Sequence, residues 1–181
     1  MALKDDLRPD VMVESYGTLT VPVLQRLKLR ALVLDIDNTL AACREILPSP
    51  SLLAWIDSLK TGGIRLAIVS NAGRKRTGRF ADSMGIAGFA RSGKPAVHAL
   101  LEAMRQLETA PEETGLLGDQ LFTDILGANR AGMTSILVKP VCYWYEPPQV
   151  VLKRFPEFFL RWYFKRHPHV IRIAKGDPAW E

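Results

Sequence analysis

The chain has 181 residues, of which 48% are hydrophobic and 24% are charged, as in an ordinary soluble globular domain. This composition excludes a wholly disordered or fibrous chain, and no apolar run approaches the roughly 18 residues of a membrane span. The formal net charge of +5 points to nucleic acid or an anionic membrane as a partner only if the positive charge is concentrated in one region.

Short apolar runs alternate with amphipathic stretches along most of the chain. The apolar runs predict buried strands at residues 31–35, 64–70, 115–119 and 134–138. The amphipathic stretches predict helices at residues 51–59, 75–84, 95–107 and 124–131, the third of them beginning at a proline. Strands that alternate with helices are typical of βαβ units. The predicted fold class is therefore α/β, a single domain with a mostly parallel sheet flanked by helices.

Polar residues follow three of the predicted strands. Asp35 and Asp37 follow the first, Ser70 and Asn71 the second, and Asp119 the third. Ligands of open α/β sheets bind outside the carboxyl ends of the strands. We therefore expect these side chains to meet in one crevice although they lie far apart in the sequence.

Asp35 and Asp37 place two carboxylates at the end of one hydrophobic strand. A carboxylate attacks phosphorus when a hard cation neutralises the phosphate, which gives an aspartyl-phosphate intermediate. A second carboxyl group then protonates the leaving oxygen and later activates the water that cleaves the intermediate. Taken alone, such a pair also serves as a helix cap or a divalent-ion site, so the other strand ends decide between these interpretations.

The remaining polar residues supply partners for a phosphate group. Ser70 and Asn71 offer a hydroxyl group and free backbone N–H groups where a helix begins. Lys94 precedes a predicted helix, where its charge balances a nucleophile and a transferring phosphoryl group. Asp119 and Asp124 add two acids, whose oxygens suit Mg²⁺, although Asp124 could instead cap the following helix.

These four blocks, in this order, resemble the motifs of the haloacid dehalogenase (HAD) superfamily of phosphatases, over residues 32–132. The resemblance implies that Asp35 is the nucleophile and Asp37 the general acid and base. It implies that Ser70 binds phosphate and that Lys94 is the stabilising catalytic cation. It also implies a Mg²⁺ site at Asp35, Asp37, Asp119 and Asp124, in which Asp119 is a metal ligand and Asp124 supports the site.

The spacing of the motifs leaves no room for a cap domain. About 33 residues separate Asp37 from Ser70, and about 24 separate Ser70 from Lys94. Each interval holds one crossover helix with its loops but not a domain. We therefore expect one Rossmann-like HAD domain with an open site. Such a site suits a large substrate, a membrane-bound substrate, or an oligomer whose neighbour supplies the lid.

Among capless members, the chain most resembles the YqeG-type branch, which is related to mitochondrial phosphatidylglycerophosphate phosphatases. The resemblance extends to Leu7-Arg-Pro9 with Ser15, and to residues 35–40, 93–95 and 134–140. It implies removal of the terminal phosphate of phosphatidylglycerophosphate, which yields phosphatidylglycerol. One alternative is a soluble sugar, nucleotide or protein phosphate as the substrate. Another is a non-catalytic phosphate-sensing or interaction module, against which a second catalytic acid argues.

The positive charge is concentrated in the last 31 residues. Residues 151–181 hold seven Lys and Arg against three acids, so we divide the chain into a phosphatase domain (1–150) and a basic, aromatic helical extension (151–181). Its aromatics at 155, 158, 159 and 162 form a helical stripe, which fits packing on the sheet or a partner subunit as well as peripheral membrane contact. A recognised nucleic-acid module is missing, so we expect no nucleic-acid partner.

Three further features bear on location and substrate. The acidic N-terminus does not resemble a signal peptide. Cys43 and Cys142 form no CxxC pair, which favours buried thiols in a reducing compartment. We therefore expect a cytoplasmic protein, which is peripheral to the membrane if the extension binds lipid. The cations Arg74, Lys75, Arg76 and Arg79 follow the phosphate loop and are either a solvated helix face or a site for a second phosphate. Residues 143–145 predict a packed aromatic loop.

Overall fold

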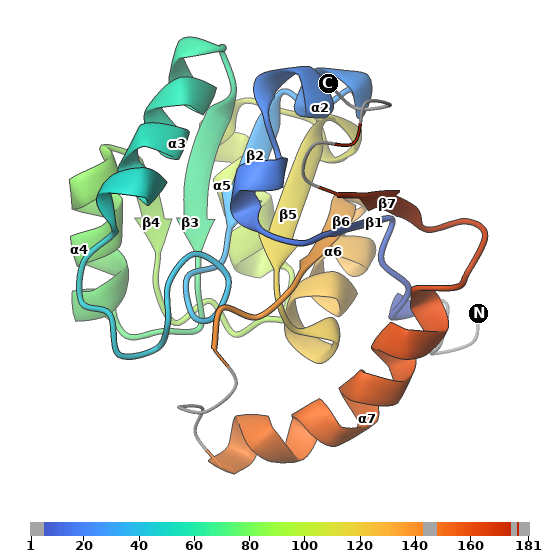
Figure 1. Ribbon diagram of the computed structural model, residues 1–181. Coiled ribbons are helices and arrows are strands. Elements are labelled where there is room, and N and C mark those ends of the chain that lie inside the picture. The colour runs from blue at the N-terminus through green and yellow to red at the C-terminus, as the bar shows by residue number, and fades with distance from the viewer. Residues whose placement is uncertain (1–5, 143–147, 175–176, 178–181) are drawn as a thin grey trace.

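A parallel sheet forms the centre of the protein. The computed structural model describes residues 6–142, 148–174 and 177. Within these residues the sheet has seven strands in the order β4-β3-β2-β5-β6-β1-β7, and every neighbouring pair is parallel (Figure 1). The strands are β1 (Val11–Val13), β2 (Ala31–Leu34), β3 (Arg65–Val69), β4 (Ala87–Phe89), β5 (Thr114–Gly118), β6 (Thr134–Val138) and β7 (Ile171–Ile173). The predicted α/β fold class is confirmed.

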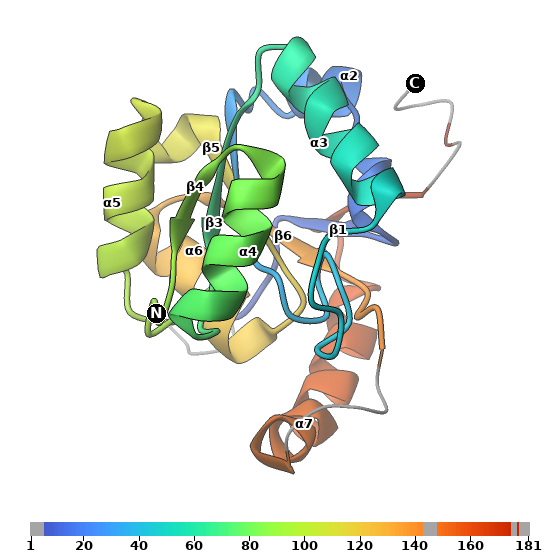
Figure 2. The same ribbon diagram turned by 90° about the vertical axis from the view of Figure 1, so that its left-hand side faces the viewer.

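Helices cover both faces of this sheet, as Figure 2 shows. The α-helices are α2 (Val21–Arg26), α3 (Pro50–Thr61), α4 (Arg74–Met84), α5 (His98–Leu107), α6 (Leu126–Ala131) and α7 (Pro148–Phe164). Short 3₁₀ turns η1 (Tyr16–Thr18) and η2 (Pro111–Glu113) and a π-helical turn η3 (Leu121–Ile125) complete the elements.

Alternate residues of β2 enter two separate cores. Leu32 and Leu34 pack with residues of α3 and α4, whereas Ala31 and Val33 pack with residues of α5 and α6. Successive side chains of a strand point to opposite faces, so a central strand covered by helices on both sides is apolar throughout. This explains why the sequence shows continuous apolar runs rather than alternation.

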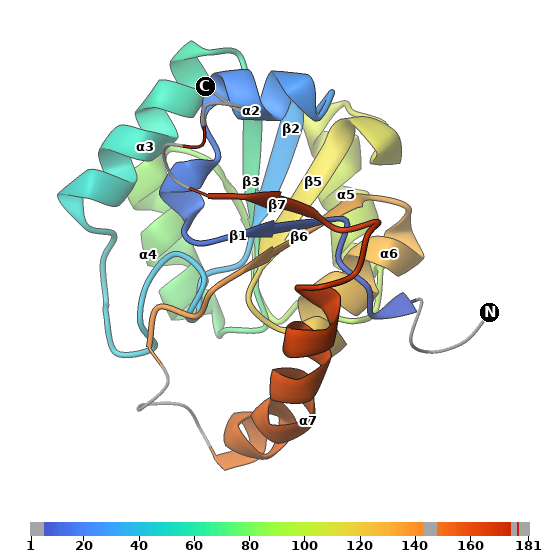
Figure 3. The ribbon, with the colours of Figure 1, turned by 45° about the vertical axis from the view of Figure 1, so that its right-hand side comes forward.

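The C-terminal segment joins the same sheet. β7 pairs with β1, and Phe164 at the end of α7 packs in a third core with Leu121, Ile125 and Leu137. Figure 3 shows α7 below β1 and β7, at the end of the molecule where η3 lies. The predicted division at residue 150 remains a prediction, but the described part of residues 151–181 contributes both a helix and a strand to the fold.

Two local predictions are wrong. The helix predicted from Pro95 begins at His98, because the side chain of Asn71 binds the backbone N–H and C=O of Lys94 and fixes the preceding loop. The thiols of Cys43 and Cys142 are half-buried rather than buried, because both residues lie in loops that follow strands. The predicted aromatic loop at residues 143–145 lies outside the described residues.

No domain is inserted between the motifs. One helix, α3, connects β2 with β3, and α4 with β4 occupies the interval between Ser70 and Lys94. This stretch is described in full, and it confirms the capless architecture.

Candidate active site

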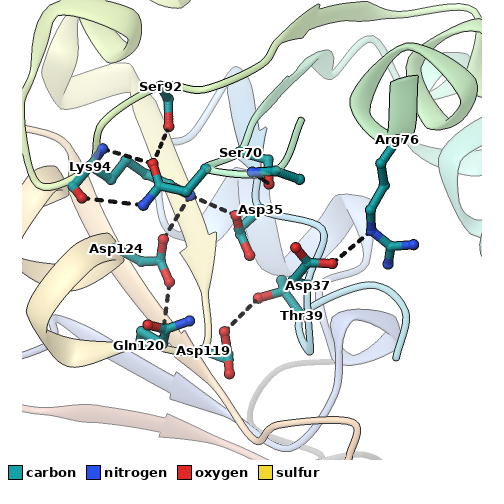
Figure 4. A network of polar contacts seen from close by, with 12 residues as sticks. Asp35, Asp37, Thr39, Ser70, Arg76, Ser92, Lys94, Asp119, Gln120 and Asp124 are labelled. Atoms are coloured by element: carbon teal, nitrogen blue, oxygen red, sulfur yellow. Dashed lines mark hydrogen bonds and ion pairs between the residues drawn. The ribbon is translucent and has the colours of Figure 1, made fainter. Parts of the chain in front are cut away.

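Four loops at the carboxyl edge of the sheet bring the predicted residues together (Figure 4). Asp35 follows β2, Ser70 follows β3, Lys94 follows β4, and Asp119 follows β5. Asp124 lies in η3, which comes directly after the β5 loop. The adjacent strands β3, β2 and β5 end at the same edge, so residues up to 89 positions apart in the sequence, such as Asp35 and Asp124, become neighbours.

Lys94 links two of these carboxylates. Its Nζ lies 2.7 Å from Oδ1 of Asp35 and 2.7 Å from Oδ1 of Asp124, and all three side chains are buried. Asn71 fixes the lysine backbone, because its Oδ1 accepts from the N–H of Lys94 (2.9 Å) and its Nδ2 donates to the carbonyl of Lys94 (3.2 Å). Ser92 donates its hydroxyl hydrogen to the same Oδ1 of Asn71 (2.8 Å). Asn71 is therefore placed to orient Lys94, whereas its contact with phosphate stays a prediction.

Burial and charge perturb both members of this pair. Burial raises the pKa of Asp35 to about 6, and the carboxylate of Asp124 adds to the rise, while Lys94 opposes it. Burial alone lowers the pKa of Lys94, but the carboxylates of Asp124 and Asp35 outweigh it and raise that pKa above its ordinary value. Lys94 therefore carries a positive charge in the site at neutral pH.

Three carboxylates form a cluster that fits a divalent cation. Oxygens of Asp35, Asp119 and Asp124 lie within 4.8 Å of one another, and all three residues are buried. When the three are ionised, Lys94 balances only one of their charges, and buried charge requires compensation. An all-oxygen donor set with an excess of negative charge suits Mg²⁺. The cluster is held by Thr39, whose hydroxyl donates to Oδ1 of Asp119 (3.4 Å), and by the N–H of Gln120, which donates to Asp124 (3.0 Å).

Asp37 lies apart from this cluster. Its Oδ1 accepts a hydrogen bond from Nε of Arg76 at 2.7 Å, and its side chain remains one-third exposed. Arg76 also donates to the backbone carbonyls of Ala42 (3.0 Å) and Glu45, which fixes the loop after β2 against α4. Asp37 was predicted as a metal ligand as well as an acid, but its side chain is directed to Arg76 and does not share the carboxylate cluster. The structure thus separates it from the three acids around Lys94.

Ser70 is buried beside the loop of residues 71–73. Its Oγ accepts from the N–H of Ala72 at 3.2 Å, and its own backbone N–H pairs with Phe89 of β4. The hydroxyl hydrogen of Ser70 is thereby directed away from Ala72. As predicted, a helix follows the loop: α4 begins at Arg74, with Gly73 as its N-cap.

Two residues of α7 that sequence reasoning missed hold the loop that carries Asp119. Glu157 is buried, and its Oε1 accepts from the N–H groups of Leu121 (2.9 Å) and Phe122 (3.3 Å). Arg161 donates to the backbone carbonyls of Asp119 and Val138. In the sequence, these two residues stand out only as an acid and an arginine four positions apart on a predicted aromatic helix. A solvent-exposed ion pair on a helix has the same spacing, so this pattern does not identify their role.

The stripe of aromatics on α7 does not enter the core. The exposed fractions of Phe158, Phe159 and Trp162 are 67, 59 and 57%, whereas Phe164 is buried. The side chain of Phe155 lies outside the described residues. Arg166 stacks on Trp162, with its guanidinium carbon 4.2 Å from a ring centroid. Phe158, Phe159 and Trp162 therefore do not pack on the sheet of the same chain.

Comparisons with known proteins agree with this site. The HAD-hydrolase-like family model matches residues 91–140. The chain is 35% identical to the probable phosphatase YqeG of Bacillus subtilis, over 77% of this chain and 81% of that protein. It is 29% identical to the mitochondrial phosphatidylglycerophosphatase GEP4 of Saccharomyces cerevisiae, over 73% and 77% of the two chains.

Solved structures show the same fold. The cobalt-bound deoxy-D-mannose-octulosonate 8-phosphate phosphatase of Haemophilus influenzae superposes with a TM-score of 0.52 at 18% identity, over 63% of this chain and 71% of that chain. A predicted HAD-like family hydrolase of Porphyromonas gingivalis has a TM-score of 0.52 at 15% identity, over 71% and 98%. Fold and site together define a phosphatase of the HAD type. The chain belongs to the capless HAD phosphatases, in their YqeG-type branch.

Proposed function

We propose that the protein hydrolyses the phosphomonoester of phosphatidylglycerophosphate through an aspartyl-phosphate on Asp35. The observation that carries the reaction is the placement of Asp35 beside Lys94 and within the carboxylate cluster, with Asp37 held separately by Arg76. Support for the substrate comes from two relatives named as phosphatidylglycerophosphate phosphatases, GEP4 and an Arabidopsis thaliana protein 30% identical over 77% of this chain.

In the first step, a carboxylate oxygen of Asp35 attacks phosphorus and forms a new O–P bond. The P–O bond to the substrate's glycerol breaks, and the leaving oxygen takes a proton from Asp37. Ser70 donates to a phosphoryl oxygen, and Lys94 offsets the charge that develops near Asp35. The ionised form of Asp35 is the nucleophile, so the step requires loss of the proton that burial favours.

In the second step, water attacks the phosphorus of the aspartyl-phosphate and gives its proton to Asp37. The O–P bond to Asp35 breaks, inorganic phosphate leaves, and both carboxyl groups return to their starting protonation states. Asp37 is suited to both proton transfers because it is partly exposed to water and lies outside the carboxylate cluster.

Asp35, Asp119 and Asp124 would hold Mg²⁺. When bound there, the ion neutralises phosphate charge and so lets an anionic nucleophile approach an anionic ester. The fixed cation Lys94 alone does not balance the buried carboxylates, so we expect turnover to depend on the metal.

Exposed apolar residues around the site support a lipid substrate. Nine large hydrophobic residues among the described residues are exposed, and seven of them belong to the loop after β2, the segment after β6 or α7, which lie at the carboxyl end of the sheet in Figure 1: Ile46, Leu47, Val141, Phe158, Phe159, Trp162 and Tyr163. In the described residues no helix is both long and apolar enough to cross a bilayer. We therefore propose peripheral contact with the membrane that contains the substrate, through α7 and the neighbouring loops.

The substrate is tested by phosphate release, with and without Mg²⁺, from phosphatidylglycerophosphate in mixed micelles and from soluble sugar, nucleotide and protein phosphates. We expect rapid Mg²⁺-dependent release from the lipid and slow release from the soluble compounds. Turnover of the soluble compounds alone would contradict the lipid assignment and leave a soluble phosphomonoester as the substrate. The absence of release from every compound would contradict the enzymatic proposal.

A further inference from the structure

A small cationic cavity lies between the loop after β2 and helix α4. Its volume is about 220 Å³, and it is lined by Cys43, Arg44, Ile46, Lys75, Arg76 and Arg79. Four of these six residues are cationic, and no carboxylate is among them. A concave site with several positive side chains is suited to an anionic group.

The positive charge of this cavity is only partly compensated. Arg76 pairs with Asp37, but in the described part of the chain no carboxylate lies within ion-pair distance of Lys75 or Arg79. These two residues lie four positions apart on α4, so their side chains emerge on the same face of the helix. Both residues line the cavity, whereas the side chains of a merely solvated helix face project into open solvent.

The cavity adjoins the side of the site where the leaving group departs. Arg76, which lines the cavity, donates to Asp37 at 2.7 Å. In the proposed reaction Asp37 protonates the leaving oxygen, so the leaving group extends from Asp35 past Asp37. The rest of the leaving group therefore lies next to the cavity.

We infer that this cavity binds a second phosphate group, a phosphodiester or phosphomonoester carried by the leaving group. The inference rests on the proposed function. In phosphatidylglycerophosphate, a glycerol unit joins the reacting phosphate to the phosphodiester, and the acyl chains follow. The structure links the matching features: Asp35 and Asp37 follow β2, Arg76 joins Asp37 to the cavity, and Ile46 of the cavity wall and the adjacent Leu47 are each 60% exposed on the same loop.

Three substrates separate the second phosphate from the lipid: glycerol 3-phosphate, the water-soluble deacylated headgroup glycerophosphoglycerophosphate, and phosphatidylglycerophosphate in micelles. The test variant is Lys75→Ala/Arg79→Ala. The control variant, Arg105→Ala/Arg130→Ala, removes the same charge from exposed positions near the ends of α5 and α6. Arg76 is left intact because it binds Asp37.

We expect wild-type kcat/KM to be higher for the deacylated headgroup than for glycerol 3-phosphate. The test variant should lower kcat/KM for the headgroup by about tenfold or more, mainly through KM, because charge-assisted hydrogen bonds to phosphate are lost. It should change glycerol 3-phosphate turnover by less than about threefold, a difference typical of a lost long-range charge effect. An equal loss for both substrates, or the same loss in the control variant, would overturn the inference.

Calorimetric binding of glycerophosphoglycerol, the reaction's soluble product headgroup, provides a readout that needs no turnover. Weaker binding to the test variant, with unchanged binding to the control variant, would support the cavity even if no substrate were hydrolysed. The absence of hydrolysis would instead refute the proposed function. Hydrolysis by a wild-type protein that does not distinguish the headgroup from glycerol 3-phosphate would overturn the cavity and leave the phosphatase reaction intact. A loss with the micellar lipid but not with the soluble headgroup would show that the cations bind the lipid surface, and would overturn the subsite.

Discussion

The charge state of Asp35 connects burial with the proposed catalysis at the level of single residues. Burial makes its ionised form unfavourable, and Lys94 at 2.7 Å recovers part of that cost. The same lysine also contacts Asp124, so one cation organises acids from two different loops. Its position depends in turn on Asn71, a residue predicted to bind phosphate.

Asp35→Asn should abolish phosphate release, with a loss of about a thousandfold or more, because the amide is a poor nucleophile and the other residues cannot replace it. The protein should still fold, because asparagine has the same shape and Lys94 keeps its contact with Asp124. Activity is measured with the micellar lipid, and folding by circular dichroism. Retained hydrolysis in a folded variant would rule out Asp35 as the nucleophile.

The affinity for Mg²⁺ should depend on pH through Asp35. In the metal-free protein the pKa of this carboxyl group is about 6, so below that pH a proton competes with the cation. The apparent affinity should rise as the pH increases from about 5 to about 7 and then level off. Calorimetry at each pH measures it.

Asp35→Asn is the matched control for this pH dependence, because it removes the titrating group at the same position. The variant should bind Mg²⁺ more weakly and lack the rise near pH 6. An unchanged profile in the variant would show that another group titrates.

At the level of elements, helix α7 supports the loop that carries Asp119. The buried carboxylate of Glu157 accepts hydrogen bonds from two N–H groups at the start of η3, because the first N–H groups of a helical turn have no acceptor within the turn. Asp119 precedes this turn and Asp124 lies within it, so α7 fixes the spacing of two acids in the cluster. Truncation of the chain at residue 150 would therefore disturb the active site as well as remove the extension.

Glu157→Leu should lower the free energy of unfolding by about 2 kcal/mol or more, because it removes the acceptor of the buried N–H of Leu121 and of the partly buried N–H of Phe122. It should also weaken Mg²⁺ binding, an effect that a purely structural role would not produce. Glu157→Gln keeps an acceptor oxygen and should recover most of both losses. Denaturant unfolding and calorimetry measure the two quantities. Unaltered Mg²⁺ affinity in a destabilised Glu157→Leu protein would limit Glu157 to a structural role.

The predicted elements agree with the structure where the signal lies within the element itself. The four strands were predicted because each is buried on both faces and therefore continuously apolar. β1, β4 and β7 were missed because three residues are too few to show a pattern. The start of α5 was predicted wrongly because a contact with Asn71, 23 positions earlier, fixes the loop before it.

For the whole molecule, the open site and most of the exposed apolar residues lie at the same end. A capless site leaves the substrate in contact with the surroundings, and a bilayer surface can then take the place of a lid. Lys165 and Arg166 follow the exposed aromatics of α7, which matches the charge of an anionic leaflet.

Replacing Phe158, Phe159 and Trp162 together with serine should reduce binding to anionic vesicles by about tenfold or more, because three large apolar groups are lost from the contact surface. Hydrolysis of the soluble headgroup should be unchanged. Leu101→Ser is the matched control, because this exposed residue lies on α5, away from α7. Co-sedimentation with vesicles measures binding. Undiminished sedimentation, or conversion of a dimer to a monomer in the variant, would favour a protein partner on this face.

The sequence by itself determined the fold class, the order of the four motifs and the absence of a cap, because these follow from apolar runs and from the distances between motifs. It also identified the residues that meet at the site, since strand ends of a parallel sheet share an edge. Only the tertiary structure showed that Asn71 orients Lys94, that Arg76 separates Asp37 from the other acids, and that α7 holds the Asp119 loop. These contacts join residues between 23 and 39 positions apart whose types also suit a solvent-exposed surface, so no local pattern distinguishes them.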